Sequence, residues 1–225
     1  MQENRETKRL KTVLYNNDNL IYPLSEKDKS HAVRFASSLT IKSFERPDII
    51  AFTPSAALLL EHFSVDAQER SNAPTIKAPD MHVNELVESI APSGRYITKE
   101  AFEENLSHSF DKHIKNTDIY LQHFRHKANK TYDTQLGIII DSASDPLVIG
   151  HTWRKTYMLP FHFASFRNRL RANPRVQHIF YIFKTVRGKE RILYMNNNPA
   201  SLAALNEIAH LGVFPPGDGV EITLT

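Results

Sequence analysis

Two carboxylates, Asp48 and Glu61, lie next to apolar runs that predict short buried strands. Residues of a strand alternate between its two faces, so Glu61 projects to the same side as Phe63, and His62 projects to the opposite side. A buried carboxylate without a partner is costly in free energy. Two carboxylates on adjacent strands can share a divalent cation, which removes this cost and creates a site. In the alternative interpretation, both acids lie at strand ends and face water.

The spacing of these residues resembles the motif of the PD-(D/E)XK nuclease superfamily. In that family, Pro-Asp opens one strand and an acid-x-lysine triplet lies on the next. Here Pro47-Asp48 is followed, after 12 residues, by Glu61-His62-Phe63, which comes directly after the apolar run Leu58-Leu59-Leu60. The chain departs from the motif at the third position of the triplet, where Phe63 replaces the lysine.

The resemblance implies a metal-dependent nuclease that hydrolyses phosphodiester bonds of DNA or RNA. Asp48 and Glu61 would be its catalytic residues and would bind Mg²⁺ or Mn²⁺ through hard carboxylate oxygens. The lysine of the motif orients the attacking water, which Phe63 cannot do. Lys42 and Lys127 are the candidates to replace it, and the sequence does not rank them.

The missing lysine leaves a second hypothesis open. The chain can be a catalytically inactive nucleic-acid-binding or assembly protein that keeps the fold and lacks the chemistry. A third hypothesis, a protein-interaction module that binds no metal, requires the basic residues described below to be coincidental. A role in defence against mobile elements follows from the resemblance alone.

The motif requires a sheet to position it, and the pattern of the chain predicts one. Apolar periodicity and turn residues predict a helix, three strands, a long helix, a strand, a helix and a hairpin, which cover residues 25–39, 40–44, 47–52, 57–65, 98–130, 135–141, 160–172 and 177–195. This order matches the α-β-β-β-α-β core of the resembled superfamily. We therefore expect an α/β fold with a mixed central sheet and helices on both faces.

The first predicted helix, residues 25–39, supplies a further candidate ligand. Ser25 is a good N-cap, and Asp28 lies on the same stripe as the buried face. In the resembled superfamily an acid on this helix often completes the metal site, so Asp28 is the candidate; a favourable charge at a helix N-terminus is the alternative. The expected domains are an N-terminal arm, residues 1–24, and one nuclease-like domain, residues 25–225, with a loop-rich insertion at 66–97.

Basic residues are concentrated in the last third of the chain. Between Gly150 and Arg191 there are ten lysines and arginines and a single acid, Glu190. Such a one-sided distribution is typical of proteins that bind phosphate backbones. The candidate contacts to DNA or RNA are Arg154, Lys155, Arg167, Arg171 and Arg175. The alternative is a solvated helix face whose counter-charges come from the acidic region 61–118.

The composition limits the class of protein. The chain of 225 residues is 41% hydrophobic, which suffices for a large core, and it has no cysteine, which excludes disulfides and cysteine-bound metals. It has no apolar run of 18 residues and no apolar segment near its N-terminus, so we expect neither a membrane partner nor a signal peptide. The expected location is the cytoplasm. Sequence specificity, protein partners and oligomeric state are not predicted by the sequence.

Overall fold

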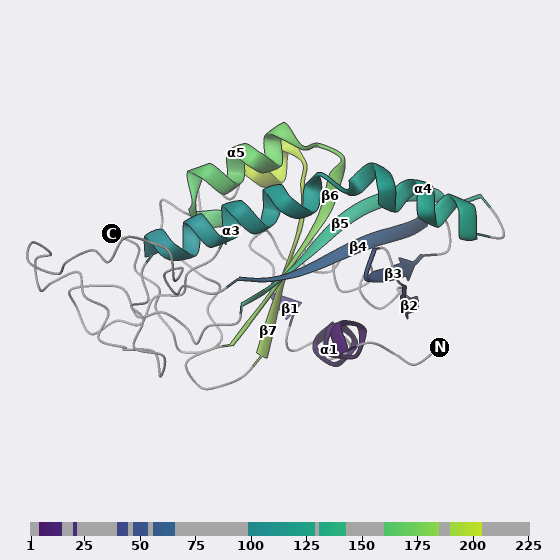
Figure 1. The fold of residues 1–225 in the computed structure, drawn as a ribbon. Helices are drawn as coiled ribbons and strands as arrows, with labels where there is room; N and C mark the ends of the chain where they lie inside the picture. The colour runs from purple at the N-terminus through teal and green to yellow at the C-terminus, as the bar shows by residue number, and fades with distance from the viewer. Residues whose placement is uncertain are drawn as a thin grey trace, which may run out of the picture.

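A seven-stranded mixed sheet forms the centre of the molecule (Figure 1). The computed structural model describes residues 5–14, 20–21, 40–44, 47–53, 56–65, 99–128, 131–142, 160–184 and 190–203. The strands are β1 (Leu20–Ile21), β2 (Thr40–Ser43), β3 (Ile49–Phe52), β4 (Ala56–Val65), β5 (Asp133–Ser142), β6 (Val176–Lys184) and β7 (Glu190–Asn196). Their order across the sheet is β1-β7-β6-β5-β4-β3-β2.

The sheet contains three parallel and three antiparallel strand pairs. Strands β4, β5 and β6 run parallel and form its centre, while β2, β3 and β4 form an antiparallel meander. Strand β7 is antiparallel to β6 and parallel to the short β1. The expected pairing of the two motif strands is confirmed, because Ile49 of β3 lies opposite Leu60 of β4. The unbroken apolar run of β5 is buried in the middle of the sheet, as such runs predict.

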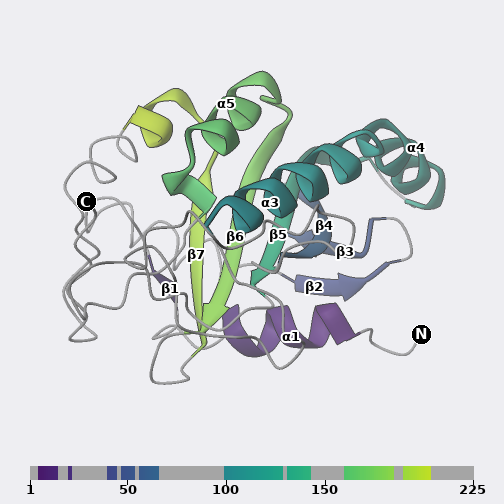
Figure 2. The same cartoon turned by 60° about the vertical axis from the view of Figure 1, so that its left-hand side comes forward.

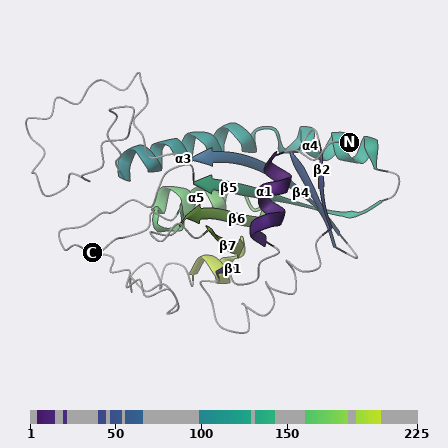
Figure 3. The same ribbon diagram turned by 90° about the horizontal axis from the view of Figure 1, so that it is seen from below.

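Helices cover both faces of the sheet (Figures 2 and 3). The helices α3 (Lys99–Ile114), α4 (Thr117–Lys127) and α5 (Ala164–Ala172) lie on one face, and α1 (Arg5–Leu14) lies on the other. The expected long helix is thus two helices that meet at a turn around Asn116. The expected α/β fold with a mixed sheet between helices is confirmed. No helix of the described residues is long and apolar enough to cross a membrane.

Helix α1 occupies part of the expected N-terminal arm. Its residues Thr7 and Leu10 are buried, and Leu10 packs in the same apolar cluster as Ile41 and Ile192. The Ser43 hydroxyl donates a hydrogen bond to the Thr7 hydroxyl at 3.0 Å, which ties the helix to β2. The arm therefore contributes to the core. The helix predicted at 25–39 and the insertion at 66–97 lie outside the described residues.

His178 is a buried polar residue at the centre of the sheet. Its Nδ1 lies 2.8 Å from the Tyr194 hydroxyl of β7, and its Nε2 lies 2.8 Å from Gln135 Oε1 of β5. An amide oxygen only accepts hydrogen bonds, so Nε2 carries the proton and Nδ1 accepts from Tyr194. Burial lowers the pKa of His178 to about 4, because the charged imidazolium would be poorly solvated.

This lowered pKa predicts a loss of stability in mild acid. The unfolded chain binds a proton at His178 near pH 6.5, and the folded chain does so only near pH 4, so the stabilisation present above pH 6.5 disappears as the pH falls to 4. The expected loss is roughly 3 kcal/mol. Urea unfolding of wild type and His178→Gln between pH 7 and 4 measures it. The His178→Gln variant should show a shallower decline, and His126→Gln, an exposed control, should follow wild type; parallel curves for His178→Gln would contradict the assignment.

Candidate functional site

Asp48 and Glu61 lie side by side where β3 begins. Asp48 directly precedes Ile49, and Ile49 pairs with Leu60, so the antiparallel register brings Asp48 opposite Glu61. Asp48 Oδ2 also accepts a hydrogen bond from the backbone N–H of His62 at 2.9 Å. Since residues alternate between faces, both carboxylates belong to the face covered by α3 and α4. The structure therefore brings the two predicted acids together.

The Glu61 carboxylate is held by two side chains that the sequence did not single out. The Tyr120 hydroxyl of α4 donates a hydrogen bond to Glu61 Oε1 at 2.7 Å, and His113 Nδ1 of α3 lies 2.8 Å from the same oxygen. Only 13% of the Glu61 side chain is exposed. Burial, together with the hydrogen bond and charge of Glu61 and the charge of Asp48, raises the pKa of Tyr120 far above its usual range. Tyr120 is therefore a permanent hydrogen-bond donor in this site.

Phe63 fills the position where the motif has lysine. Its ring stacks on the imidazole of His113, with centroids 5.2 Å apart and planes at 23°. Phe63 is buried in the apolar cluster beneath α3 and α5. The group next to Glu61 at this point is thus a histidine from α3, which Phe63 orients by packing against it.

The two lysines proposed as replacements lie over aromatic rings beside α4. The Nζ atom of Lys42 is 5.7 Å from the centroid of Phe52, and Nζ of Lys127 is 5.5 Å from that of Phe44. Phe44 and Phe52 pack against the cluster around Phe124. Both of these distances are to aromatic rings, and neither is to a carboxylate oxygen of Asp48 or Glu61. Asp28, the third candidate ligand, lies outside the described residues.

The candidate arginines make contacts within the protein. Arg167 Nη1 donates to the Phe161 carbonyl at 2.5 Å, and Arg171 Nη1 donates to Asn168 Oδ1 at 2.8 Å. Burial and the charge of Arg171 lower the pKa of Arg167, which is consistent with both lying on one face of α5.

The candidate Arg175 and its neighbour Arg169 pair with acids of α4 and α3. Arg175 Nη1 lies 2.9 Å from Asp118, and Arg169 Nε lies 3.1 Å from Asp111. Counter-charges from the acidic region therefore neutralise part of the predicted basic surface. Arg154 and Lys155 lie outside the described residues.

A second group of charged residues lies on the opposite face of the sheet. Arg9 of α1 contacts Asp141 at the end of β5, with Nη2 to Oδ1 at 2.9 Å and Nε to Oδ2 at 2.6 Å. Arg9 Nη1 lies 3.1 Å from Glu190 of β7. His62 points to this face, as its place beside Glu61 predicts, with Nε2 3.7 Å from Asp141 Oδ2. These contacts attach α1 to the sheet and are separate from Asp48 and Glu61.

The donor set at Asp48 and Glu61 suits a hard cation. Each carboxylate uses one oxygen for a described hydrogen bond, Oδ2 in Asp48 and Oε1 in Glu61. Within the described residues, no group of three or more histidines, aspartates or glutamates is arranged to hold a metal.

Comparison with known proteins gives no matching family model, no matching curated protein and no matching solved structure.

Proposed function

We propose that the chain is a metal-dependent nuclease that hydrolyses phosphodiester bonds of DNA or RNA. The observation that carries this proposal is the opposed pair Asp48 and Glu61 at the start of β3 and within β4. The Glu61 side chain is 13% exposed and lies opposite Asp48, so a divalent cation bound by both carboxylates would relieve their mutual repulsion, in addition to the contact of Glu61 with His113.

Asp48 and Glu61 are the residues that would hold Mg²⁺ or Mn²⁺, because both ions prefer carboxylate oxygens. When bound, such a cation lowers the pKa of a water ligand and neutralises charge on the phosphate. Tyr120 and His113 hold the Glu61 carboxylate in one orientation through Oε1. The Asp48 carboxylate is oriented by the His62 amide. A metal site needs protein ligands whose orientation is fixed, and these hydrogen bonds fix both carboxylates.

The order of elements also supports the proposal. The meander β2-β3-β4, the helices α3 and α4, and the strand β5 parallel to β4 agree with the β-β-β-α-β part of the superfamily core. The motif residues occur on the second and third strands of this series, as the resemblance requires. A restriction-endonuclease-like topology remains part of the proposal.

A catalytically inactive nucleic-acid-binding or assembly protein is the second candidate. Two observations favour it. Phe63 packs in the core where the motif has lysine, and Glu61 Oε1 already has two hydrogen-bond partners without a metal. In this case the carboxylates and His113 would serve to join β4 to α3 and α4.

Cleavage assays with the wild-type protein separate the two candidates. Supercoiled plasmid, single-stranded DNA and RNA are incubated with Mg²⁺ or Mn²⁺, and a sample with EDTA is the control. The nuclease proposal expects cleavage that requires the metal. It also expects Mn²⁺ to raise the melting temperature, by roughly 5–10 °C at a hundredfold excess over its Kd. No cleavage with either metal and no rise in melting temperature would favour the inactive protein.

Binding of the nucleic-acid backbone by α5 gives a second test. Replacing Arg167 and Arg171 together by alanine should weaken binding of DNA or RNA of every sequence, because phosphate contacts carry no sequence information. The slope of log K against log salt for duplex DNA should fall by about 0.9 for each lost contact. Arg5→Ala with Lys8→Ala removes the same charge from the opposite face and is the matched control. An unchanged affinity at low salt would exclude α5 from the interface.

A further inference from the structure

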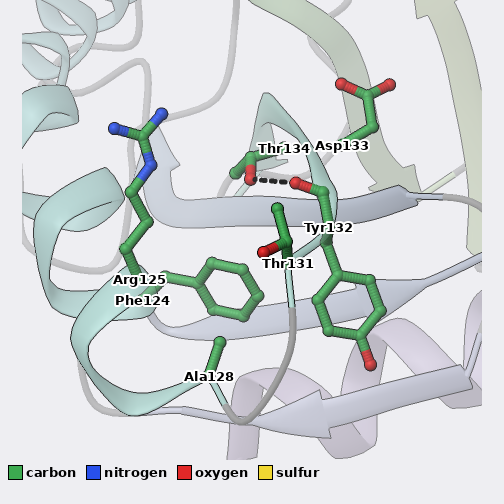
Figure 4. A pocket seen from close by; sticks show the side chains of 7 residues that line it. All are labelled: Phe124, Arg125, Ala128, Thr131, Tyr132, Asp133 and Thr134. Carbon is green, nitrogen blue, oxygen red and sulfur yellow. Dashed lines mark hydrogen bonds between the residues drawn. The ribbon is translucent and has the colours of Figure 1, made fainter.

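A pocket lies between the last turn of α4 and the start of β5 (Figure 4). Its volume is about 670 Å³, within the usual range for pockets that bind small molecules. Phe124, Arg125, Tyr132 and Asp133 are among its lining residues. The pocket is distinct from the pair Asp48 and Glu61, which lies further along β4.

Aromatic rings form the apolar part of this pocket. The centroids of Phe124 and Tyr132 are 6.0 Å apart, and Tyr132 packs against Phe52 at 5.2 Å. Phe124 is almost fully buried, whereas Tyr132 is partly exposed. Tyr132 therefore presents an immobilised ring to the pocket. A planar, aromatic ligand gains most from such a surface, because stacking needs a flat partner and little reorganisation.

Charged groups of opposite sign complete the lining. Arg125 is exposed and makes no ion pair with any residue that the structure describes, and Asp133 is exposed at the start of β5. In Figure 4 the Asp133 carboxylate points away from the rings of Phe124 and Tyr132, and its Oδ2 accepts a hydrogen bond from Gln135 Nε2 at 3.3 Å. The C-terminal turn of α4 favours a cation at Arg125 in any case. It does not explain why a partly exposed aromatic ring, Tyr132, lines the same pocket as that cation.

We propose that this pocket binds one unpaired nucleotide of a DNA or RNA strand. The base stacks on Tyr132, and Arg125 binds a phosphate of the strand. The inference rests on the proposed function in taking a nucleic acid as the ligand. It adds the substrate class, which is single-stranded nucleic acid or a duplex with an unpaired end.

The position of the pocket is compatible with delivery of the strand to the carboxylates. Phe124 follows Tyr120 by one helical turn, about 6 Å along α4. Asp133 precedes Ile138, the residue that pairs with Glu61, by five residues of β5, about 16 Å along the strand. A strand held in the pocket therefore reaches Glu61 within a few nucleotides.

Binding measured without metal tests the pocket independently of catalysis. Fluorescence anisotropy of a labelled single-stranded oligonucleotide is followed in EDTA for wild type, Arg125→Gln, Tyr132→Leu and Arg5→Gln. Loss of one phosphate contact should weaken binding about fivefold at 0.1 M salt, so Arg125→Gln is expected to do so. Loss of one stacked base should weaken it at least about fivefold in Tyr132→Leu. Arg5→Gln, an exposed arginine of α1, should bind as wild type does.

Three results would overturn the inference. The first is equal affinity of Arg125→Gln and the Arg5→Gln control, which does not depend on whether Tyr132→Leu folds. The second is tighter binding of a blunt duplex than of the single strand. The third is a free mononucleotide that binds as tightly as the oligonucleotide, which would make the ligand a nucleotide and not a strand. Absence of cleavage with Mg²⁺ or Mn²⁺ beside intact, Arg125-dependent binding would reject the nuclease and leave the pocket assignment standing.

Discussion

Asp48→Asn and Glu61→Gln are each expected to abolish metal-dependent cleavage. Either substitution removes one of the two charges that would hold Mg²⁺ or Mn²⁺, and it leaves the other carboxylate without the cation that offsets it. The loss of rate should be at least about a hundredfold, the scale found when one preorganised electrostatic contact of a transition state is removed. Initial rates on plasmid and single-stranded substrates measure it.

Both substitutions preserve the hydrogen bonds seen in the structure. An asparagine at position 48 still offers an oxygen to the His62 amide, and a glutamine at position 61 still accepts from the Tyr120 hydroxyl. The variants therefore test charge and not folding. Thermal unfolding without metal should remain close to that of wild type, and binding to nucleic acid should be largely retained.

Matched controls and a double variant sharpen the result. Asp111→Asn and Glu104→Gln make the same chemical changes at exposed positions of α3, and both should cleave as wild type does. Because one cation needs both acids, the effects of Asp48→Asn and Glu61→Gln should not add in the double variant. Full cleavage by both single variants would remove these carboxylates from the reaction. Additive partial losses would indicate two separate roles.

Local patterns in the sequence were sufficient to predict six of the seven strands, and β1 was not among them. The apolar runs of β3, β4 and β5 have the length and composition of buried strands, and the prediction of paired motif strands rested on them. The residues Asn116-Thr117-Asp118, which are poor helix formers, mark the point where the predicted helix 98–130 divides into α3 and α4. Helix α1 was missed because charges dominate its segment, in which Thr7 and Leu10 are the buried residues among the side chains that the structure describes. Two buried positions three residues apart are too weak a signal in so polar a sequence.

The partners of the candidate site were beyond the reach of the sequence. His113 and Tyr120 follow Glu61 by 52 and 59 residues, so only the packing of α3 and α4 on β4 brings them to its carboxylate. The ion pairs of Arg169 and Arg175 with helix acids are equally distant in sequence. Periodicity predicts which face a side chain occupies, and tertiary packing decides which group lies across from it. For this reason the two acids were found and the histidine beside them was not.

Gly137→Ala is expected to destabilise the fold strongly. A Cβ atom at Gly137 would lie 2.7 Å from Leu60 Cδ2 of β4 and 2.8 Å from the His178 carbonyl oxygen of β6. The leucine can change rotamer, but the carbonyl belongs to a backbone that cannot move alone. The register between β5 and β6 shifts between Leu136 and Gly137, so the glycine lies at an irregularity of the pairing.

The substituted chain can relieve this contact only by separating β5 from β6. His178 resists such a movement because its ring is hydrogen-bonded to both Tyr194 and Gln135. We expect a loss of about 3 kcal/mol and a fall of about 6–12 °C in melting temperature. Calorimetry measures both, with Ser64→Ala on the exposed side of β4 as the control. Adding Leu60→Val removes the contact with Cδ2 but not the one with the carbonyl, so it should restore only part of the stability. A melting temperature within about 2 °C of wild type would mean that β6 can shift relative to β5 at little cost in free energy. The part of the sheet that carries Glu61 would then be less rigid than these contacts indicate.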